Sequence, residues 1–118
     1  MNVVVVAGVL SSAPVHRVLK SGEELLSCEV TVRSPERSTE TVPVVWPSPP
    51  AAAASLEAGL EVVVTGRVRR RFFRSGGATA SRTEVVADVV VLSRRRTKAA
   101  ASIAAAAAAL GPPRPDVG

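Results

Sequence analysis

One short stretch of the chain concentrates side chains that bind phosphates and flat rings. Residues 66–77 read GRVRRRFFRSGG, with five arginines and two phenylalanines in the first nine positions and a double glycine at the end. These phenylalanines are two of only three aromatic residues in the chain. Guanidinium groups neutralise phosphates, and an exposed ring stacks on any nucleobase with roughly 1–3 kcal/mol. The stretch therefore has the chemistry of a surface for unpaired nucleic acid.

Strand parity indicates which of these side chains share a face. If residues 60–73 form one strand, alternation places Phe73 on the solvent side with three arginines and turns Phe72 toward the core with Arg70. The three arginines are Arg67, Arg69 and Arg71. A β-bulge at Gly66 would exchange the two faces, so parity alone leaves open which phenylalanine stacks. The structural alternative is that the rings plug a barrel end and the arginines are solvated.

The third aromatic residue and the single cysteine are both candidates for the core. Trp46 shares parity with Val42 and Val44, but Val45 occupies the other face, so alternation does not decide its side. A lone tryptophan in a small domain is more often buried than exposed. Cys28 lies on the apolar parity of the alternating segment 24–33, which favours a small buried hydrophobe over a reactive thiol. A single cysteine provides neither an internal disulfide nor a thiolate metal cluster.

The positive charge is unevenly distributed. The formal net charge is +5, and residues 67–98 hold ten of the fifteen Lys and Arg residues but only two acids, Glu84 and Asp88. Such a patch favours a nucleic-acid partner. Lysine occurs only at Lys20 and Lys98, so an Arg-, Ala-, Val- and Pro-rich chain can also reflect genome base composition. The basic count alone therefore carries little weight.

Enzymatic chemistry has few residues to draw on. His16 is the only histidine, and Asp88 and Asp116 are the only aspartates, too sparse for a nucleophile with its base or for a carboxylate pair. The segment 75–83 lacks the Lys-Ser/Thr ending of a phosphate-binding loop. We therefore expect no enzyme, no metal site and no cofactor. Residues 1–10 lack a basic leader and are too short to span a membrane, so we expect a cytoplasmic protein without a membrane partner.

The elements that position these residues are predicted to be strands. The 118 residues suit one domain with a five-stranded core, and twenty-two valines favour β-structure. The predicted strands are residues 1–20 interrupted at Pro14 and turning at Ser21-Gly22, then 24–33, 41–46, 60–73 and 81–92. A polar loop is expected at 34–40, a short helix at 51–59 closed by Gly59, and a hairpin loop at 75–80.

This order predicts an all-β fold, a five-stranded Greek-key barrel of the OB type with a short helix between strands 3 and 4. We expect residues 1–93 to form the binding domain. Residues 94–118 form a basic, Ala/Pro-rich, low-complexity tail. Its alanines favour a helix that is marginal in water without packing.

Four segments, in matching order and spacing, resemble the bacterial single-stranded DNA-binding protein family. Residues 8–22, GVLSSAPVHRVLKSG, resemble the family's G-x-L-x-x-x-P-x-x-R-x-x-x-x-G run, and the strand 26–33 follows where the family has F-x-L-A-V. Residues 63–73, VVTGRVRRRFF, resemble V-x-G-R-L-R-x-R-x-W, and residues 81–92 resemble the T-E-V-V-A-D strand. The similarity covers residues 1–92.

The resemblance implies an OB-fold homotetramer that binds single-stranded DNA in replication, recombination or repair. Phe73 falls on a stacking tryptophan of the family, although counting back from Thr83-Glu84 favours Phe72. Trp46 falls on another stacking aromatic, which raises its standing as a candidate. The expected binding residues, several of them on or beside backbone-contacting positions, are Trp46, Phe72, Phe73, Arg33, Arg67, Arg69, Arg70, Arg71 and Arg74.

The chain also departs from the family. Residues 34–41 offer no counterpart to two further stacking tryptophans, Pro43 interrupts a regular strand, and the end PPRPDVG replaces the acidic, partner-recruiting peptide. We therefore expect a shortened or divergent member, with a dimer as the alternative to a tetramer. Three other interpretations stay open: a primosomal-type OB accessory protein, an RNA-binding barrel, and an oligomeric scaffold without a nucleic-acid role.

Overall fold

The structure is a computed structural model that describes residues 1–111, and of residue 37 only the backbone. Residues 112–118 lie outside this description. They include the end of the predicted tail, where the sequence lacks the acidic, partner-recruiting peptide of the family. The strands are β1 (Val4–Leu10), β2 (Val15–Val18), β3 (Glu24–Ser34), β4 (Arg37–Pro47), β5 (Glu61–Ser75) and β6 (Ala78–Leu92). A 3-10 helix, η1 (Ala51–Ser55), precedes β5, and an α-helix, α1 (Arg96–Ala108), follows β6.

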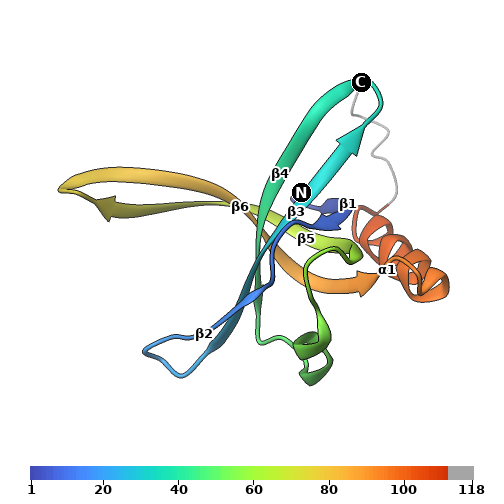
Figure 1. Cartoon of the computed structure of the whole chain (residues 1–118), viewed down its shortest axis with the longest axis horizontal. Coiled ribbons are helices and arrows are strands. Elements are labelled where there is room, and N and C mark those ends of the chain that lie inside the picture. Colours follow the sequence, from blue (N-terminus) through green and yellow to red (C-terminus); the bar gives the residue numbers. More distant parts are fainter. Residues whose placement is uncertain (112–118) are drawn as a thin grey trace.

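Five of the strands close into a barrel (Figure 1). The hydrogen-bonded order is β1-β5-β6-β4-β3, and β3 returns to β1 at the pairs Val9–Thr31 and Leu10–Val30. β2 pairs with β3, and β4 runs parallel to β6 through Val44 and Val85. The prediction of a five-stranded, mostly β barrel is confirmed.

The helices differ from the expectation. The segment 51–59 forms the five-residue 3-10 helix η1, after which Leu56 is again extended, and the α-helix of the fold lies after β6. α1 packs on β1, β5 and β6 and buries Ala99, and this packing stabilises an Ala-rich helix that would be marginal alone. Within residues 1–111, no helix is long and apolar enough to cross a membrane.

The two long hairpins are tighter than predicted. Between β3 and β4 only Pro35 and Glu36 form the turn, where we expected a loop over residues 34–40. Between β5 and β6 only Gly76 and Gly77 form the turn, and both have the positive φ that a type I′ hairpin requires. Both strand pairs extend past the barrel, where neither face needs apolar residues, so their polar sequences resembled loops.

Alternation along the strands builds the core. In β3, Leu26, Cys28 and Val30 are at most 5% exposed, as the period of two predicts. The buried hydrophobic cluster consists of Leu10, Leu26, Cys28, Val30, Val44, Trp46, Ala53, Val62, Val64, Val85 and Ala87. In β5 these buried valines stop at Val64, and every residue from Arg67 to Ser75 is exposed.

Two glycines allow the barrel wall to close. A Cβ on Gly66 would collide with the backbone carbonyl of Val86, and a Cβ on Gly8 would collide with that of Thr31. At Gly66 the register of β5 with β6 also shifts, because Thr65 pairs with Val89 and Gly66 with Ala87. The residue without a partner is therefore Asp88, and the bulge lies in β6.

We expect Gly66→Ala to lower the free energy of unfolding by about 3 kcal/mol, because the new methyl meets rigid backbone. Gly77→Ala is the matched control, since its Cβ has open space and only its positive φ disfavours alanine, by about 1 kcal/mol. Urea denaturation measures both values. Equal stability of the two variants would contradict a close approach at Gly66.

Burial raises the pKa of the Cys28 thiol from its ordinary value of 9.0 to about 11. The folded protein then binds the thiol proton more tightly than the unfolded chain does. The contribution of this proton to the free energy of unfolding is therefore fully present below pH 9 and is lost as the pH rises through 11. We expect the free energy of unfolding to fall by about 2–3 kcal/mol across that interval. Tyrosine titration does not add to this pH dependence, because the chain has no tyrosine. Cys28→Ala should flatten this pH profile, and an unchanged slope would contradict it.

Candidate nucleic-acid interface

The outer halves of β5 and β6 leave the barrel as a two-stranded ribbon, residues 67–82. β1 stops pairing with β5 at Val4–Gly66, whereas β5 and β6 remain paired as far as Ser75–Ala78 (Figure 1). At the base of the ribbon the Asn2 side chain donates to the Val68 carbonyl (2.6 Å) and accepts from its N–H (2.8 Å). The ribbon is thus anchored at one end, and every residue of its β5 strand is exposed.

The register assigns the candidate side chains to two faces. Arg69 lies opposite Glu84, Arg71 opposite Arg82, and Phe73 opposite Ala80. Because the bulge adds its residue to β6, the alternation within β5 is uninterrupted. One face of the ribbon therefore carries Arg67, Arg69, Arg71 and Phe73, and the other carries Arg70, Phe72 and Arg74.

The expectation that Phe72 points into the core is wrong. Its side chain is 66% exposed and that of Phe73 is 37% exposed. Phe72 does share its parity with the core residues Val62 and Val64, but the barrel has ended before the chain reaches it. Both rings are consequently on the surface, one on each face.

Glu84 organises the Phe73 face. Its carboxylate is only 2% exposed and accepts a 2.5 Å hydrogen bond from Arg69, while Arg71 Nε lies 3.5 Å from the other carboxylate oxygen. The Arg71 guanidinium in turn lies 5.4 Å from the centre of the Phe73 ring. Charge-assisted bonds restrict side-chain rotation, so Glu84 holds two half-exposed cations in place beside a ring.

A groove of about 220 Å³ continues this face onto the barrel, between the ribbon and the outer side of β3 and β4. Arg17, Pro43, Val45 and Arg82 are among its lining residues, and Arg82 lies 3.9 Å from Glu29. Sequence reasoning missed Arg17 and Arg82 as site residues. Counting outward from the Gly-Gly turn would have placed Arg82 opposite Arg71.

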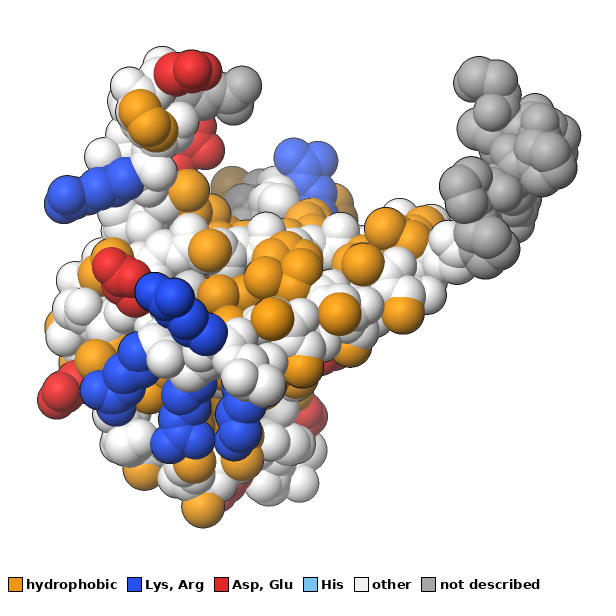
Figure 2. Space-filling view, turned by 90° about the vertical axis from the view of Figure 1, so that its right-hand side faces the viewer, with side chains coloured by type: hydrophobic (Ala, Val, Ile, Leu, Met, Phe, Trp, Pro, Cys, Tyr) orange, Lys and Arg blue, Asp and Glu red, His pale blue; other side chains and the backbone are white. Residues whose placement is uncertain are grey.

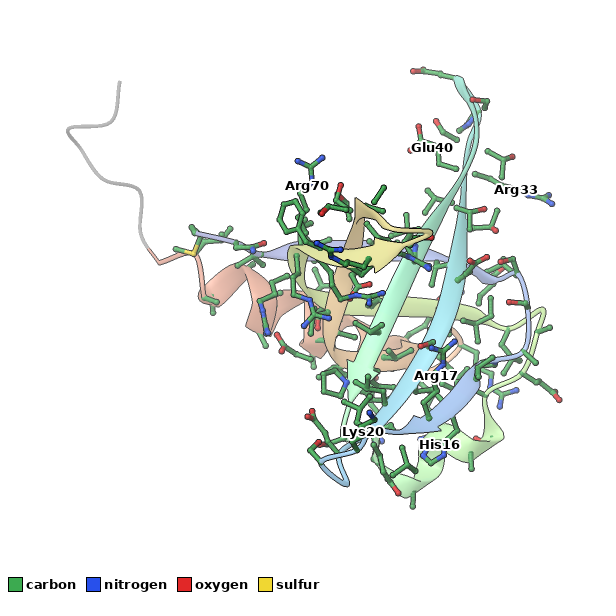
Figure 3. All side chains as sticks on the ribbon, turned by 90° about the vertical axis from the view of Figure 1, so that its left-hand side faces the viewer. His16, Arg17, Lys20, Arg33, Glu40 and Arg70 are labelled. Atoms are coloured by element: carbon green, nitrogen blue, oxygen red, sulfur yellow. The ribbon has the colours of Figure 1, made fainter. Side chains whose placement is uncertain are left out.

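Two predicted residues are not brought to the ribbon. Trp46 is 6% exposed and belongs to the core cluster, so its ring does not lie on the ribbon beside the phenylalanines. Arg33 lies near the end of β3 and lines a different pocket, beside Ala7 and Glu61. Figure 3 shows Arg33 and Arg70 on separate hairpins, well apart.

The residues considered for catalysis are dispersed. His16 lies on β2, where its Nε2 is 3.8 Å from the exposed Glu24 carboxylate, whereas Asp88 lies on β6; Asp116 is outside the described residues. Among residues 1–111, no three His, Cys, Asp or Glu side chains are close enough to hold a metal ion.

No protein-family model matches this sequence, and no curated protein matches it. The resemblance to the single-stranded DNA-binding proteins therefore rests on the motifs within residues 1–92.

We expect Glu84→Gln to destabilise the fold by about 1.5–3 kcal/mol, because the neutral amide loses two charge-assisted contacts in a buried position. Glu29→Gln removes the same charge from an exposed pair and should change stability by less than about 0.5 kcal/mol. Thermal unfolding of both variants at low and high salt tests this difference. Equal effects would mean that Glu84 does not hold the arginines.

Proposed function

We propose that this protein binds single-stranded DNA without sequence preference, and that the ribbon 67–82 is its interface. The observation that carries the proposal is the exposure of Phe72 and Phe73 among arginines on a projecting ribbon. Exposed rings in water gain from being covered by nucleobases, and every base has a face to offer. The arginines neutralise phosphates, which makes affinity depend on salt and not on base identity.

The Phe73 face is the primary contact in this proposal. It is continuous with the groove that Arg17 and Arg82 border, so a strand stacked on Phe73 can continue across the barrel. Phe72 lies on the reverse face, and the two rings therefore stack on bases that are not neighbours on one straight path. Arg69 and Arg71, held by Glu84, are already ordered before the strand arrives, which reduces the entropy lost on binding.

We further propose that the barrel is an OB-type Greek key. Support comes from the ring order β1-β5-β6-β4-β3 and from the parallel pairing of β4 with β6. The family resemblance supports a cytoplasmic homo-oligomer, with a tetramer favoured over a dimer, acting in replication, recombination or repair. The mass of the assembly in solution tests the oligomer.

Titration of labelled oligo-dT, followed by fluorescence anisotropy, tests the function. If about five phosphates are neutralised, log K should fall with log salt concentration at a slope near −3.5. Phe73→Ala should weaken binding by about tenfold, and Phe72→Ala by less, because a lost stack is worth roughly 1–3 kcal/mol. Quenching of Trp46 is not expected on binding, since its ring is buried.

Val18→Ala, an exposed apolar residue on β2 that does not line the groove, is the control for loss of hydrophobic surface and should leave the affinity unchanged. Binding that is insensitive to salt, or two folded phenylalanine variants that both bind like the wild type, would overturn the proposal. Competition with poly-U separates a DNA preference from an RNA preference.

A further inference from the structure

A cavity of about 700 Å³ lies away from the ribbon. It is bordered by η1, the last residues of β6 and the first turns of α1. In Figure 1 the ribbon and α1 lie at opposite ends of the molecule. η1, which spans only five residues, forms part of the wall of this cavity. Its size is within the range of small-molecule sites, about 300–1,000 Å³.

The cavity walls are mostly apolar. Trp46, Pro50, Leu56 and Leu92 line it together with backbone and side-chain atoms of the valines at the end of β6. Trp46, which does not lie on the ribbon, is the only aromatic side chain among these lining residues. A ligand with a flat or branched apolar body therefore gains contact area without displacing a polar partner.

The polar side chains of the cavity carry an excess of positive charge. Arg95, which directly precedes α1, and Lys98 in the first turn of α1 line it, and Asp88 is the one acidic lining residue. None of the salt bridges among residues 1–111 involves Arg95 or Lys98. Two cations that form no salt bridge within the described part of the chain, beside an apolar hollow, suit a ligand with one anionic group.

The surroundings strengthen this preference for an anion. Arg94 and Arg96 are also exposed, and the first turn of α1 contains no acidic residue. Figure 2, which views the side of the molecule that carries α1, shows Lys and Arg side chains gathered beside hydrophobic ones. Cations near the start of a helix are disfavoured by its dipole, so an anion bound there relieves an existing repulsion.

We propose that this cavity binds a small amphipathic anion, with an aromatic or branched apolar body against Trp46 and a carboxylate, sulfonate or phosphate on Arg95 and Lys98. The site is separate from the DNA interface and does not depend on it. The single tryptophan in its wall makes binding visible in the unmodified protein.

The experiment uses anilinonaphthalene sulfonate, whose fluorescence rises in apolar sites and which accepts excitation energy from tryptophan. We expect saturable binding with energy transfer from Trp46. Ala101→Leu, which fills the cavity, and Lys98→Glu, which reverses a lining charge, should each weaken binding by about tenfold.

The matched controls lie outside the cavity. Ala100→Leu adds the same side chain to the neighbouring residue of α1, which does not line the cavity, and Lys20→Glu reverses a lysine charge between β2 and β3; both should bind the probe like the wild type. Circular dichroism confirms that each variant is folded. An uncharged naphthalene analogue should bind more weakly than the sulfonate.

Three results would overturn the proposal. The first is equal weakening by Ala101→Leu and Ala100→Leu, or no weakening by either of the cavity variants. The second is equal affinity for the charged and uncharged probes, which would remove the role of Arg95 and Lys98. The third is loss of the probe on addition of oligo-dT or in Phe73→Ala, which would place the probe on the ribbon. Loss of DNA binding in Phe73→Ala with intact probe binding would support a separate site.

Discussion

The contact between the β5 backbone at Gly66 and the β6 backbone at Val86 determines where the barrel ends and the ribbon begins. Before it, β5 contributes Val62 and Val64 to the core; after it, the same strand is exposed on both faces. Pairing between β5 and β6 continues across this point, so backbone hydrogen bonds carry a solvent-exposed segment outward from a rigid base. The position of every candidate binding residue on the ribbon follows from that change in burial.

Burial of Glu84 has a comparable role for the charges. A carboxylate that is nearly inaccessible to water needs cationic or hydrogen-bonding partners, and Arg69 and Arg71 provide them while remaining about half exposed themselves. The single negative charge of Glu84 lies between the two positive charges of Arg69 and Arg71, so the net charge of the group remains positive. The contacts with Glu84 also fix the positions of the two guanidinium groups. The packing of the barrel wall and the order of the surface cations are therefore linked through one side chain.

The sequence alone predicted the strands well where one face is buried. The alternation at Leu26, Cys28 and Val30 reflects a core on one side and solvent on the other. The same reasoning failed for Phe72, because parity says which face a residue is on but not whether anything covers that face. It also underestimated the two hairpins, whose outer parts are strands without a core.

Other parts of the candidate site depend on contacts between distant segments, and a linear pattern does not encode those contacts. Arg17 reaches the groove from β2 through the pairing of β2 with β3, and Trp46 is buried by residues of η1 and β6. α1 is ordered by its packing on the barrel, although alanine content alone made it marginal. The alternation of apolar residues, the turn residues and the distribution of charge predicted the secondary-structure elements. Which side chains come into contact is determined by the closure of the sheet into a barrel.

Each face of the ribbon combines one phenylalanine with arginines, although only the Phe73 face continues into the groove. Under the proposed function, such an element offers two binding faces. If each face binds a separate segment of single-stranded nucleic acid, one protein molecule bridges two segments. Compaction of a long strand would then depend on the ratio of protein to nucleotide. A flat sheet with all its rings on one side has no such property.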